Sequence, residues 1–303
     1  MRKVVFDSDT ASDDAVALAC TLKTFDLLAV TIVAGNVSFE RQVENALFTL
    51  DYFGSDAPVF RGARRPIMGA WRTVEEVHGD NGMGGWRYPT PKKKPAGGYA
   101  PDEIIRLSKE FEGELEILAV SPLTNLALAY LKDPEIAKRV KKVWVMGGAF
   151  SRGNTTQLAE YNFWVDPEAA NIVFNAGFDL TVVPWEVAEE AALIDGSDWE
   201  KMANSRAKGA RFFVKSNRVL FEYSRSKGLP GSVQPDSLTV AVAYDRRIVE
   251  RSKKLRIDVE TCGASRGGML VDHYGLTGKP SNAEVVFSAS AERFKHAFTK
   301  WLS

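Results

Sequence analysis

Four aspartates lie within eight positions near the start of the chain, in the stretch VVFDSDTASDDAVAL. They are Asp7, Asp9, Asp13 and Asp14, and they directly follow an apolar run. Four carboxylates this close together repel one another, so folding them costs free energy unless a cation or hydrogen-bond donors compensate. A helix start with its N-cap would account for Ser12 and Asp13, but not for the first two aspartates. The spacing therefore predicts a cation site.

Short apolar, β-branched runs recur along the chain without the alternation of a half-exposed sheet, which predicts buried strands. These runs occupy residues 3–7, 27–35, 58–62, 114–120, 142–148 and 179–185. Helical periodicity predicts helices between them, at residues 13–23, 39–53, 123–132 and 166–177. Alternation of strands and helices predicts an α/β fold, a doubly wound, mostly parallel sheet flanked by helices. We expect one domain over residues 1–303.

Polar segments follow several of these strands, and sites in such sheets form at the carboxyl ends of the strands. The aspartate cluster follows the first predicted strand, and AGN (34–36), VSPLTN (120–125) and MGGAF (146–150) follow later ones. One crevice is therefore expected to collect all of them. The Gly-, Pro- and Lys-rich stretch 71–100 is expected to be a mobile loop over that crevice.

The overall composition argues against charged macromolecular partners. Lys plus Arg and Asp plus Glu both number 39, so no net field favours nucleic acid or a membrane surface. No apolar stretch approaches the ~20 residues that cross a bilayer. The start MRKVVFDSD has neither the apolar region nor the cleavage site of a secretory leader, so we expect none. Cys20 and Cys262 lie in apolar segments, which predicts buried thiols in a reducing compartment. We expect a cytoplasmic protein without nucleic-acid or membrane partners.

Beyond the aspartates, the chain resembles the inosine-uridine nucleoside hydrolase family over nearly its full length. The string DxDxxxDD is similar to the family's fingerprint DxDPGxDD, with Thr10-Ala11 in place of Pro-Gly. Further segments resemble family motifs in the same order: VAGN (33–36), HGDNGMGG (78–85), AVSPLTNLAL (119–128), the segment 145–170, DSLTVA (236–241) and GLTGKPSNAEV (275–285). The resemblance implies an enzyme that hydrolyses the N-glycosidic bond of ribonucleosides to free base and ribose.

The same resemblance implies Ca²⁺ as the cofactor. Asp9, Asp14 and Asp236 would ligate it through their carboxylates, and Val120 through its backbone carbonyl, in keeping with the preference of Ca²⁺ for oxygen ligands. Asp9 would also be the general base for the attacking water. Asp7 would support this site from behind.

The resemblance also implies which residues bind the sugar. Asp13 and Asn36 would contact the 2′/3′ side of the ribose, Asn162 the 3′-hydroxyl, and Asn154 with Glu160 the 5′-hydroxyl. Asp236 would also be within reach of the substrate. Amide and carboxylate groups supply the paired donors and acceptors that a ribose needs. Deoxyribose and 5′-phosphate substrates would be selected against.

The group that protonates the leaving base is not given by the resemblance. Many family members have a His immediately before the last metal-ligating Asp, and Pro235 stands there in this chain. Of the three histidines, His78 is the one expected near the base. We expect His273 to belong to the C-terminal tail and His296 to the last helix.

Aromatic side chains suggest a second way to handle the base. A purine-preferring subgroup of the family also lacks that His and stacks the base between aromatic rings. Trp86 and Tyr223 are candidates for such stacking, which gives a lean toward purine nucleosides. Met146 follows a predicted strand and either packs on the ribose or is a core residue.

Two alternatives remain open from the sequence. VVFDSDT also fits the DxDx[TV] pattern of haloacid-dehalogenase-like phosphatases, in which Mg²⁺ lies between two aspartates. The missing His would also suit a metal-dependent ribose- or nucleoside-binding protein with little turnover. Members of the hydrolase family are usually dimers or tetramers, so the resemblance implies a homodimer or homotetramer.

Overall fold

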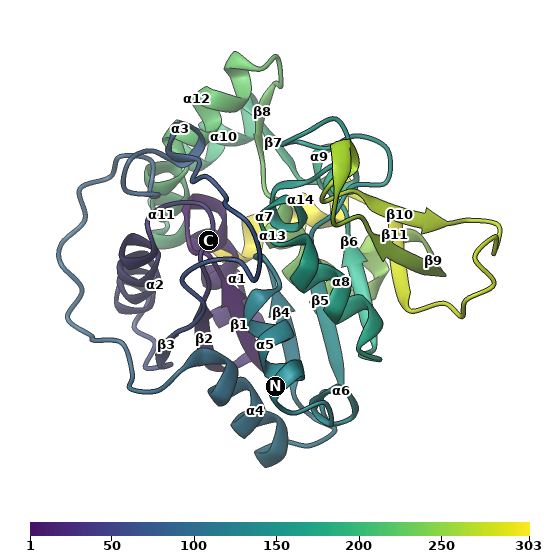
Figure 1. Cartoon of the computed structure of the whole chain (residues 1–303). Helices are drawn as coiled ribbons and strands as arrows, with labels where there is room; N and C mark the ends of the chain where they lie inside the picture. Colours follow the sequence, from purple (N-terminus) through teal and green to yellow (C-terminus); the bar gives the residue numbers. More distant parts are fainter.

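A nine-stranded sheet forms the centre of the computed structural model, which describes residues 1–303, and helices cover both of its faces (Figure 1). The strand order is β10-β9-β11-β6-β5-β4-β1-β2-β3. Its strands are β1 (Lys3–Ser8), β2 (Asp26–Ile32), β3 (Val59–Arg61), β4 (Glu116–Ala119), β5 (Lys142–Met146), β6 (Leu180–Val183), β9 (Val249–Val259), β10 (Met269–Asp272) and β11 (Ala283–Ala289). A separate antiparallel pair joins β7 (Leu193–Asp195) to β8 (Gly231–Val233).

Most neighbouring strands of the large sheet are parallel, which confirms the predicted fold class. The six predicted strands correspond to β1–β6, and β11 pairs with β6 in parallel. Strand β9 is antiparallel to both β10 and β11 and forms an arm at one end of the sheet (Figure 1). This arm was not predicted, because β9 (VERSKKLRIDV) is charged and largely exposed in its first half.

Fourteen helices connect and cover the strands. They are α1 (Ser12–Thr24), α2 (Phe39–Phe53), α3 (Glu75–His78), α4 (Ala100–Glu110), α5 (Thr124–Lys132), α6 (Ile136–Arg139), α7 (Tyr161–Val165), α8 (Pro167–Asn175), α9 (Trp185–Ala191), α10 (Gly196–Ala203), α11 (Lys208–Ser216), α12 (Arg218–Ser226), α13 (Pro235–Tyr244) and α14 (Ala291–Leu302). The four predicted helices correspond to α1, α2, α5 and α8. None of the helices is both long and apolar enough to span a lipid bilayer.

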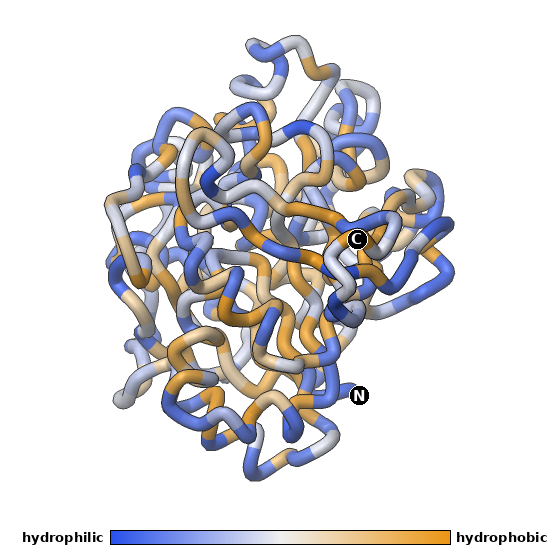
Figure 2. The backbone as a smooth tube through the Cα atoms, turned by 45° about the vertical axis from the view of Figure 1, so that its right-hand side comes forward, coloured by the Kyte–Doolittle hydropathy of each residue, from blue (hydrophilic) through white to orange (hydrophobic).

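The sheet separates two hydrophobic cores, as the period of two along a strand requires. In β1, Val4 and Phe6 belong to the core under α1 and α13, whereas Val5 belongs to the core under α4, α5 and α8. Figure 2 shows these apolar strand segments running through the interior, with hydrophilic turns at the periphery. Because both faces are covered, the central strands are apolar throughout.

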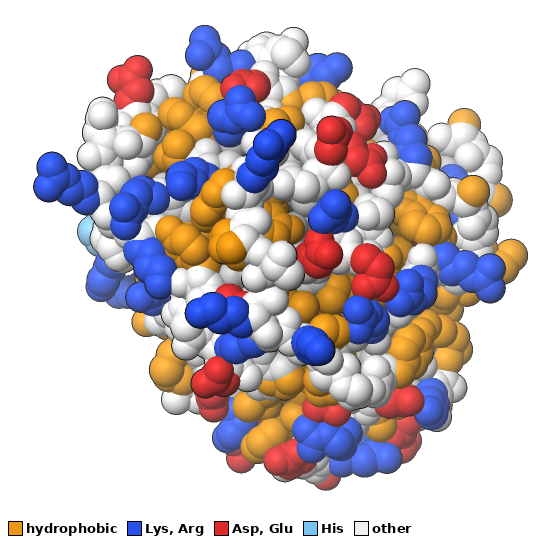
Figure 3. Space-filling view, turned by 90° about the vertical axis from the view of Figure 1, so that its left-hand side faces the viewer, with side chains coloured by type: hydrophobic (Ala, Val, Ile, Leu, Met, Phe, Trp, Pro, Cys, Tyr) orange, Lys and Arg blue, Asp and Glu red, His pale blue; other side chains and the backbone are white.

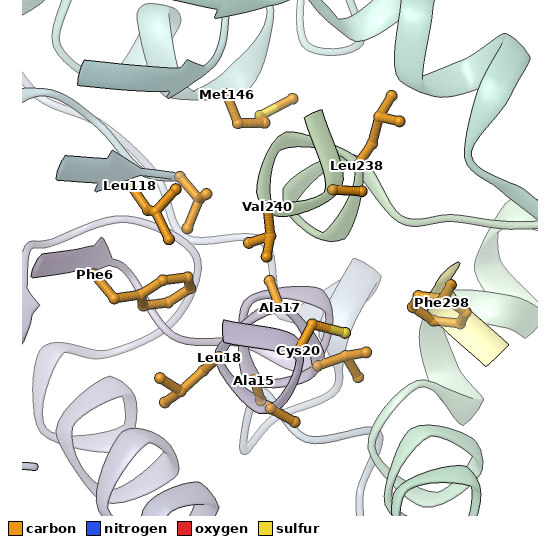
Figure 4. Packing of buried hydrophobic residues seen from close by; sticks show 14 of the residues in the cluster. Phe6, Ala15, Ala17, Leu18, Cys20, Leu118, Met146, Leu238, Val240 and Phe298 are labelled. Atoms are coloured by element: carbon orange, nitrogen blue, oxygen red, sulfur yellow. The ribbon is translucent and has the colours of Figure 1, made fainter. Parts of the chain in front are cut away.

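Helices α1 and α13 pack side by side although more than 200 residues separate them in sequence (Figure 4). Both helices are buried along most of their length, as expected of helices without a polar face. Ala17 of α1 lies beside Val240 of α13, and Cys20 lies in the same cluster (Figure 4). This packing fixes the first turn of α13 beside the first turn of α1.

The two cysteines differ in environment. Cys20 is buried, as predicted, but Cys262 is exposed at a 3₁₀ turn after β9, so the prediction of a buried thiol there was wrong. The apolar run ends at Val259, three residues before Cys262.

On the face that carries α2, lysine and arginine side chains are interspersed with acidic ones (Figure 3).

Candidate active site

A pocket of about 470 Å³ opens at the carboxyl edge of the central strands. Strand β1 leads into the aspartate cluster, Val120 follows β4, and Met146 ends β5. The first turns of α1 and α13 complete the floor. Ten of the predicted site residues line this pocket: Asp13, Asn36, His78, Val120, Met146, Asn154, Glu160, Asn162, Tyr223 and Asp236.

Three carboxylates converge at the pocket, and two of them, those of Asp13 and Asp236, line it. Asp13, Asp14 and Asp236 each offer an oxygen, and these oxygens lie within 4.8 Å of one another. The first two belong to the first turn of α1 and the third to the first turn of α13, where the helix dipoles favour negative charge. The packing of α1 on α13 thus brings acids from the two ends of the chain together.

Asp9 lies beside this trio and has two very different oxygens. Its Oδ2 accepts a hydrogen bond from the backbone N–H of Asn36 at 2.8 Å, whereas its Oδ1 is buried without any hydrogen-bond partner. Gly35 permits the close approach, because a Cβ atom there would lie 1.9 Å from Asp9 Oδ2. Asp9 is not one of the three converging acids, so its predicted ligation stays a prediction.

Burial disfavours the charged form of all four acids. It raises the pKa of Asp13 and of Asp14 to about 6. Burial, followed by repulsion from the neighbouring carboxylates, holds the pKa of Asp9 and of Asp236 well above the usual range. The one basic group in contact is His78, whose Nδ1 lies 3.5 Å from Asp13 Oδ1, and burial lowers its pKa to about 4. His78 is therefore neutral at pH 7 and does not compensate the acids.

The residues present fit a hard divalent cation. The converging ligand atoms are all oxygens, and two carboxylate oxygens of the cluster, Asp9 Oδ1 and Asp13 Oδ1, are buried without a hydrogen-bond donor. No lysine or arginine pairs with these acids. Ca²⁺ takes six to eight oxygen ligands, including backbone carbonyls such as that of Val120. A cation here would stabilise the ionised form of these acids, which burial and, for Asp9 and Asp236, neighbouring carboxylates disfavour.

Asp7 lies behind the site and is held by three side-chain donors. Asn125 Nδ2 and Thr31 Oγ1 donate to its Oδ1 at 2.8 and 2.6 Å, and Ser121 Oγ donates to its Oδ2 at 3.3 Å. Burial raises the pKa of Asp7 to about 6 despite these bonds. Asp7 does not line the pocket, which agrees with the supporting place expected for it.

The predicted sugar-binding residues Asn154, Glu160 and Asn162 reach the pocket from the start of α7 and the segment before it. Glu160 is the N-cap of α7 and accepts hydrogen bonds from the backbone N–H groups of Asn162 and Gly148, both at 2.8 Å. Burial raises the pKa of Glu160 to about 7. Asn162 Nδ2 donates to the carbonyl of Met146 at 3.1 Å and, more weakly, to that of Val120 at 3.4 Å.

Helix α12 and the first residue of α13 also contribute to the pocket. Tyr223 of α12 lines it, as does Pro235 in the position of the family's His. His78 is also present, with Ser12 Oγ 2.7 Å from its Nδ1. His273 lies beside Phe287 of β11, and His296 belongs to α14, so both are outside the pocket as expected.

Trp86 is not where the stacking hypothesis requires it. It packs on Phe48 and Phe212, with ring centroids 5.0 and 5.8 Å away, and does not line the pocket. The prediction that Trp86 stacks on the base was wrong, because its ring packs in an aromatic cluster between α2 and α11. Trp185, the first residue of α9 and the second after the end of β6, lines the pocket instead. The rule that sites gather after strands would have identified it.

Charged residues at the pocket were also missed. Arg72, Glu76, Glu189 and Lys227 line it, and nothing in their local sequence distinguishes them from ordinary surface residues. They come from the loop 71–100, from α9 and from the end of α12, so only the fold reveals their proximity.

The first half of the stretch 71–100 is fastened to the body of the protein. Asn45 of α2 donates to the carbonyls of Thr10 and Asn81, both at 3.0 Å, and accepts a hydrogen bond from Tyr88. Asn81 in turn accepts from the backbone of Met83 at 3.0 Å. A short helix, α3, also interrupts the expected loop. The mobility of the stretch 71–100 stays a prediction.

Comparison with known proteins agrees with this geometry. The family described as inosine-uridine preferring nucleoside hydrolase matches residues 4–296. Uridine nucleosidase 1 of Arabidopsis thaliana is 35% identical over 277 residues, which cover 89% of this chain and 82% of that protein. The solved structure of the plant nucleoside hydrolase PpNRh1 superposes with a TM-score of 0.94 at 31% identity, covering 99% of this chain and 98% of that one. A purine-preferring ribonucleoside hydrolase from Gardnerella vaginalis gives a TM-score of 0.93 at 28% identity, with the same coverage.

Fold, pocket and relatives together define an α/β enzyme of the N-glycosyl hydrolase class. The chain belongs to the inosine-uridine preferring nucleoside hydrolase family. Because the family match includes the aspartate cluster and spans nearly the whole chain, the phosphatase alternative has no support.

Proposed function

We propose that this enzyme hydrolyses ribonucleosides to free base and ribose with Ca²⁺ as its cofactor. The observation that carries the proposal is the unpartnered, buried Oδ1 of Asp9 beside three converging carboxylates. An ionised carboxylate in such a place costs free energy, which a bound cation offsets and which otherwise raises the pKa of the group. Asp9, Asp14, Asp236 and the Val120 carbonyl would hold the cation.

The chain's own residues divide the work of the reaction. Asp9 has one oxygen fixed by Asn36 and the other without a donor, so this second oxygen is the one that would accept the proton of the attacking water. When bound, the cation supplies positive charge that keeps the acids ionised and favours ionisation of a water. Asp13, Asn36 and Asn162 orient the ribose so that its anomeric carbon faces that water.

The 5′ end of the sugar would meet Glu160 and Asn154. Glu160 is fixed by backbone donors at the start of α7, and Asn154 Oδ1 accepts from the backbone of Tyr161 at 2.9 Å. A carboxylate in this position would accept a hydrogen bond from a 5′-hydroxyl but would repel a 5′-phosphate. The substrate class is therefore nucleosides and not nucleotides.

A panel of nucleosides tests this function. The metal-stripped protein is incubated with uridine, cytidine, inosine and adenosine, and released reducing sugar is measured without metal, with Ca²⁺ and with Mg²⁺. We expect release from at least one nucleoside, dependent on added Ca²⁺. Absence of release from every nucleoside would contradict the proposal and favour the binding-protein alternative.

We further propose a lean toward purine bases. Pro235 cannot donate a proton, and Tyr223 and Trp185 line the pocket with aromatic surface that suits a purine ring. The relatives carry different names in this respect, one a uridine nucleosidase and another a purine-preferring hydrolase. The lean therefore depends on this chain's own residues, in particular Tyr223.

A further inference from the structure

A chain of two buried hydroxyl groups leads to Asp14. Thr10 Oγ1 lies 2.7 Å from Ser8 Oγ, and Ser8 Oγ donates to Asp14 Oδ1 at 2.8 Å. All three side chains are at most 1% exposed. An ionised carboxylate can only accept, so the Ser8 proton is committed to Asp14. Thr10 must then donate to Ser8, which fixes the direction of the chain from Thr10 through Ser8 to Asp14.

The other oxygen of Asp14 is held as firmly. Its Oδ2 accepts from the backbone N–H of Ala11 at 3.0 Å and from Asn36 Nδ2 at 3.1 Å. With both oxygens engaged, the carboxylate has one orientation relative to the other acids of the site. The backbone of Thr10 is fixed as well, because its carbonyl accepts from Asn45 Nδ2 at 3.0 Å.

This arrangement depends on the sequence of this chain. Thr10-Ala11 occupies the position at which the family fingerprint has Pro-Gly. We call the row of hydrogen bonds from Thr10 through Ser8 to Asp14 the relay. A proline has no hydroxyl group, so a protein with proline at position 10 lacks the first donor of this relay. Consecutive hydrogen bonds polarise one another, so the Thr10 hydroxyl makes Ser8 a better donor to the carboxylate.

We propose that Ser8 and Thr10 are positioning residues that set the affinity of the site for Ca²⁺ by orienting Asp14. The inference rests on the proposed function, because it takes Asp14 to be a ligand of that cation. Side chains that hydrogen-bond to ligands typically change metal affinity by about 10- to 100-fold when removed. Ser8 contacts Asp14 directly and Thr10 acts through Ser8, so the two should differ in size of effect and should not be additive.

Calorimetric titration of the metal-stripped protein with Ca²⁺ tests the relay. We expect Ser8→Ala to raise the dissociation constant by about 10-fold or more, and Thr10→Val by a smaller factor. Thr10→Ser keeps the hydroxyl and should restore the wild-type value. Thr10→Val in the Ser8→Ala background should cause no further loss, because the hydroxyl then has no Ser8 to act through.

Thr21→Val is the matched control. Thr21 is a buried threonine of α1, and its hydroxyl donates only to the carbonyl of Ala17, at 2.8 Å. Its loss should leave the dissociation constant unchanged. Thermal unfolding shows whether each variant is folded, and Thr10→Ala replaces Thr10→Val should the latter not fold.

The outcomes separate the two proposals. Calcium binding that Ser8→Ala and Thr10→Val leave unchanged, or losses that add in the double variant, would overturn the relay alone. A wild-type protein that binds no Ca²⁺ would overturn the proposed cofactor and the relay together.

Discussion

Asp9 has one carboxylate oxygen that is held rigidly and one that is left without a partner. The Asn36 N–H fixes one oxygen, and Gly35 leaves just enough room for it, while the other oxygen lies buried without a donor. A general base needs this combination, because it must be oriented and yet free to accept a proton. The side chain is also costly in the metal-free fold, since burial and Asp14 both oppose its charge.

Asp9→Asn separates these two properties. We expect kcat for nucleoside hydrolysis to fall by about 10²- to 10⁴-fold, because the amide cannot accept the proton. The metal-free variant should unfold at the same or a higher temperature than wild type, because one uncompensated buried charge is gone. Steady-state assays and thermal unfolding measure the two effects, and the exposed Asp26→Asn serves as the control. A kcat within about threefold of wild type would remove Asp9 as the base.

At the scale of elements, the parallel half of the fold was predictable and the arm was not. Runs such as KVVFD and ELEILAV are apolar because both sides of β1 and β4 are covered, so their sequences identify them as strands. Strand β9 is exposed and charged, and its register depends on β11.

Much of the pocket was also predictable, because the residues that follow β1, β4 and β5 in the sequence line it. Trp86 was misplaced because its partners, Phe48 and Phe212, are distant in sequence.

Helix α12 carries the element-scale prediction. Stacking of a base on an aromatic ring contributes about 1–3 kcal/mol, so Tyr223→Ala should lower turnover of inosine by about 5-fold or more. Turnover of nitrophenyl riboside, whose leaving group needs no protonation, should fall less. Tyr223→Phe keeps the ring and should behave like wild type.

Trp86→Ala is the contrasting variant, because Trp86 packs between α2 and α11 outside the pocket. It should lower thermal stability without discriminating between the two substrates. Equal losses on both substrates in Tyr223→Ala would remove base stacking from the account.

For the whole molecule, the acids at the pocket oppose folding in the absence of metal. Folding raises the pKa of Asp7, Asp13 and Asp14 to about 6 and that of Glu160 to about 7, above the unfolded values of about 4. Between about pH 4 and these folded-state pKa values, the folded state binds more protons than the unfolded state. The stability of the folded state therefore falls as pH rises through this range. His78, with its pKa lowered to about 4, acts in the opposite direction but is a single group.

The measurement that tests the central claim most directly is thermal unfolding of the metal-stripped protein between pH 4.5 and 7.5, with and without Ca²⁺. We predict an unfolding temperature that falls with pH in the absence of metal and is restored by Ca²⁺, most strongly at the upper end of the range. Asp236→Asn should lose most of the restoration. Curves that superimpose with and without Ca²⁺ at every pH would contradict the claim that acids from the two ends of the chain hold a cation.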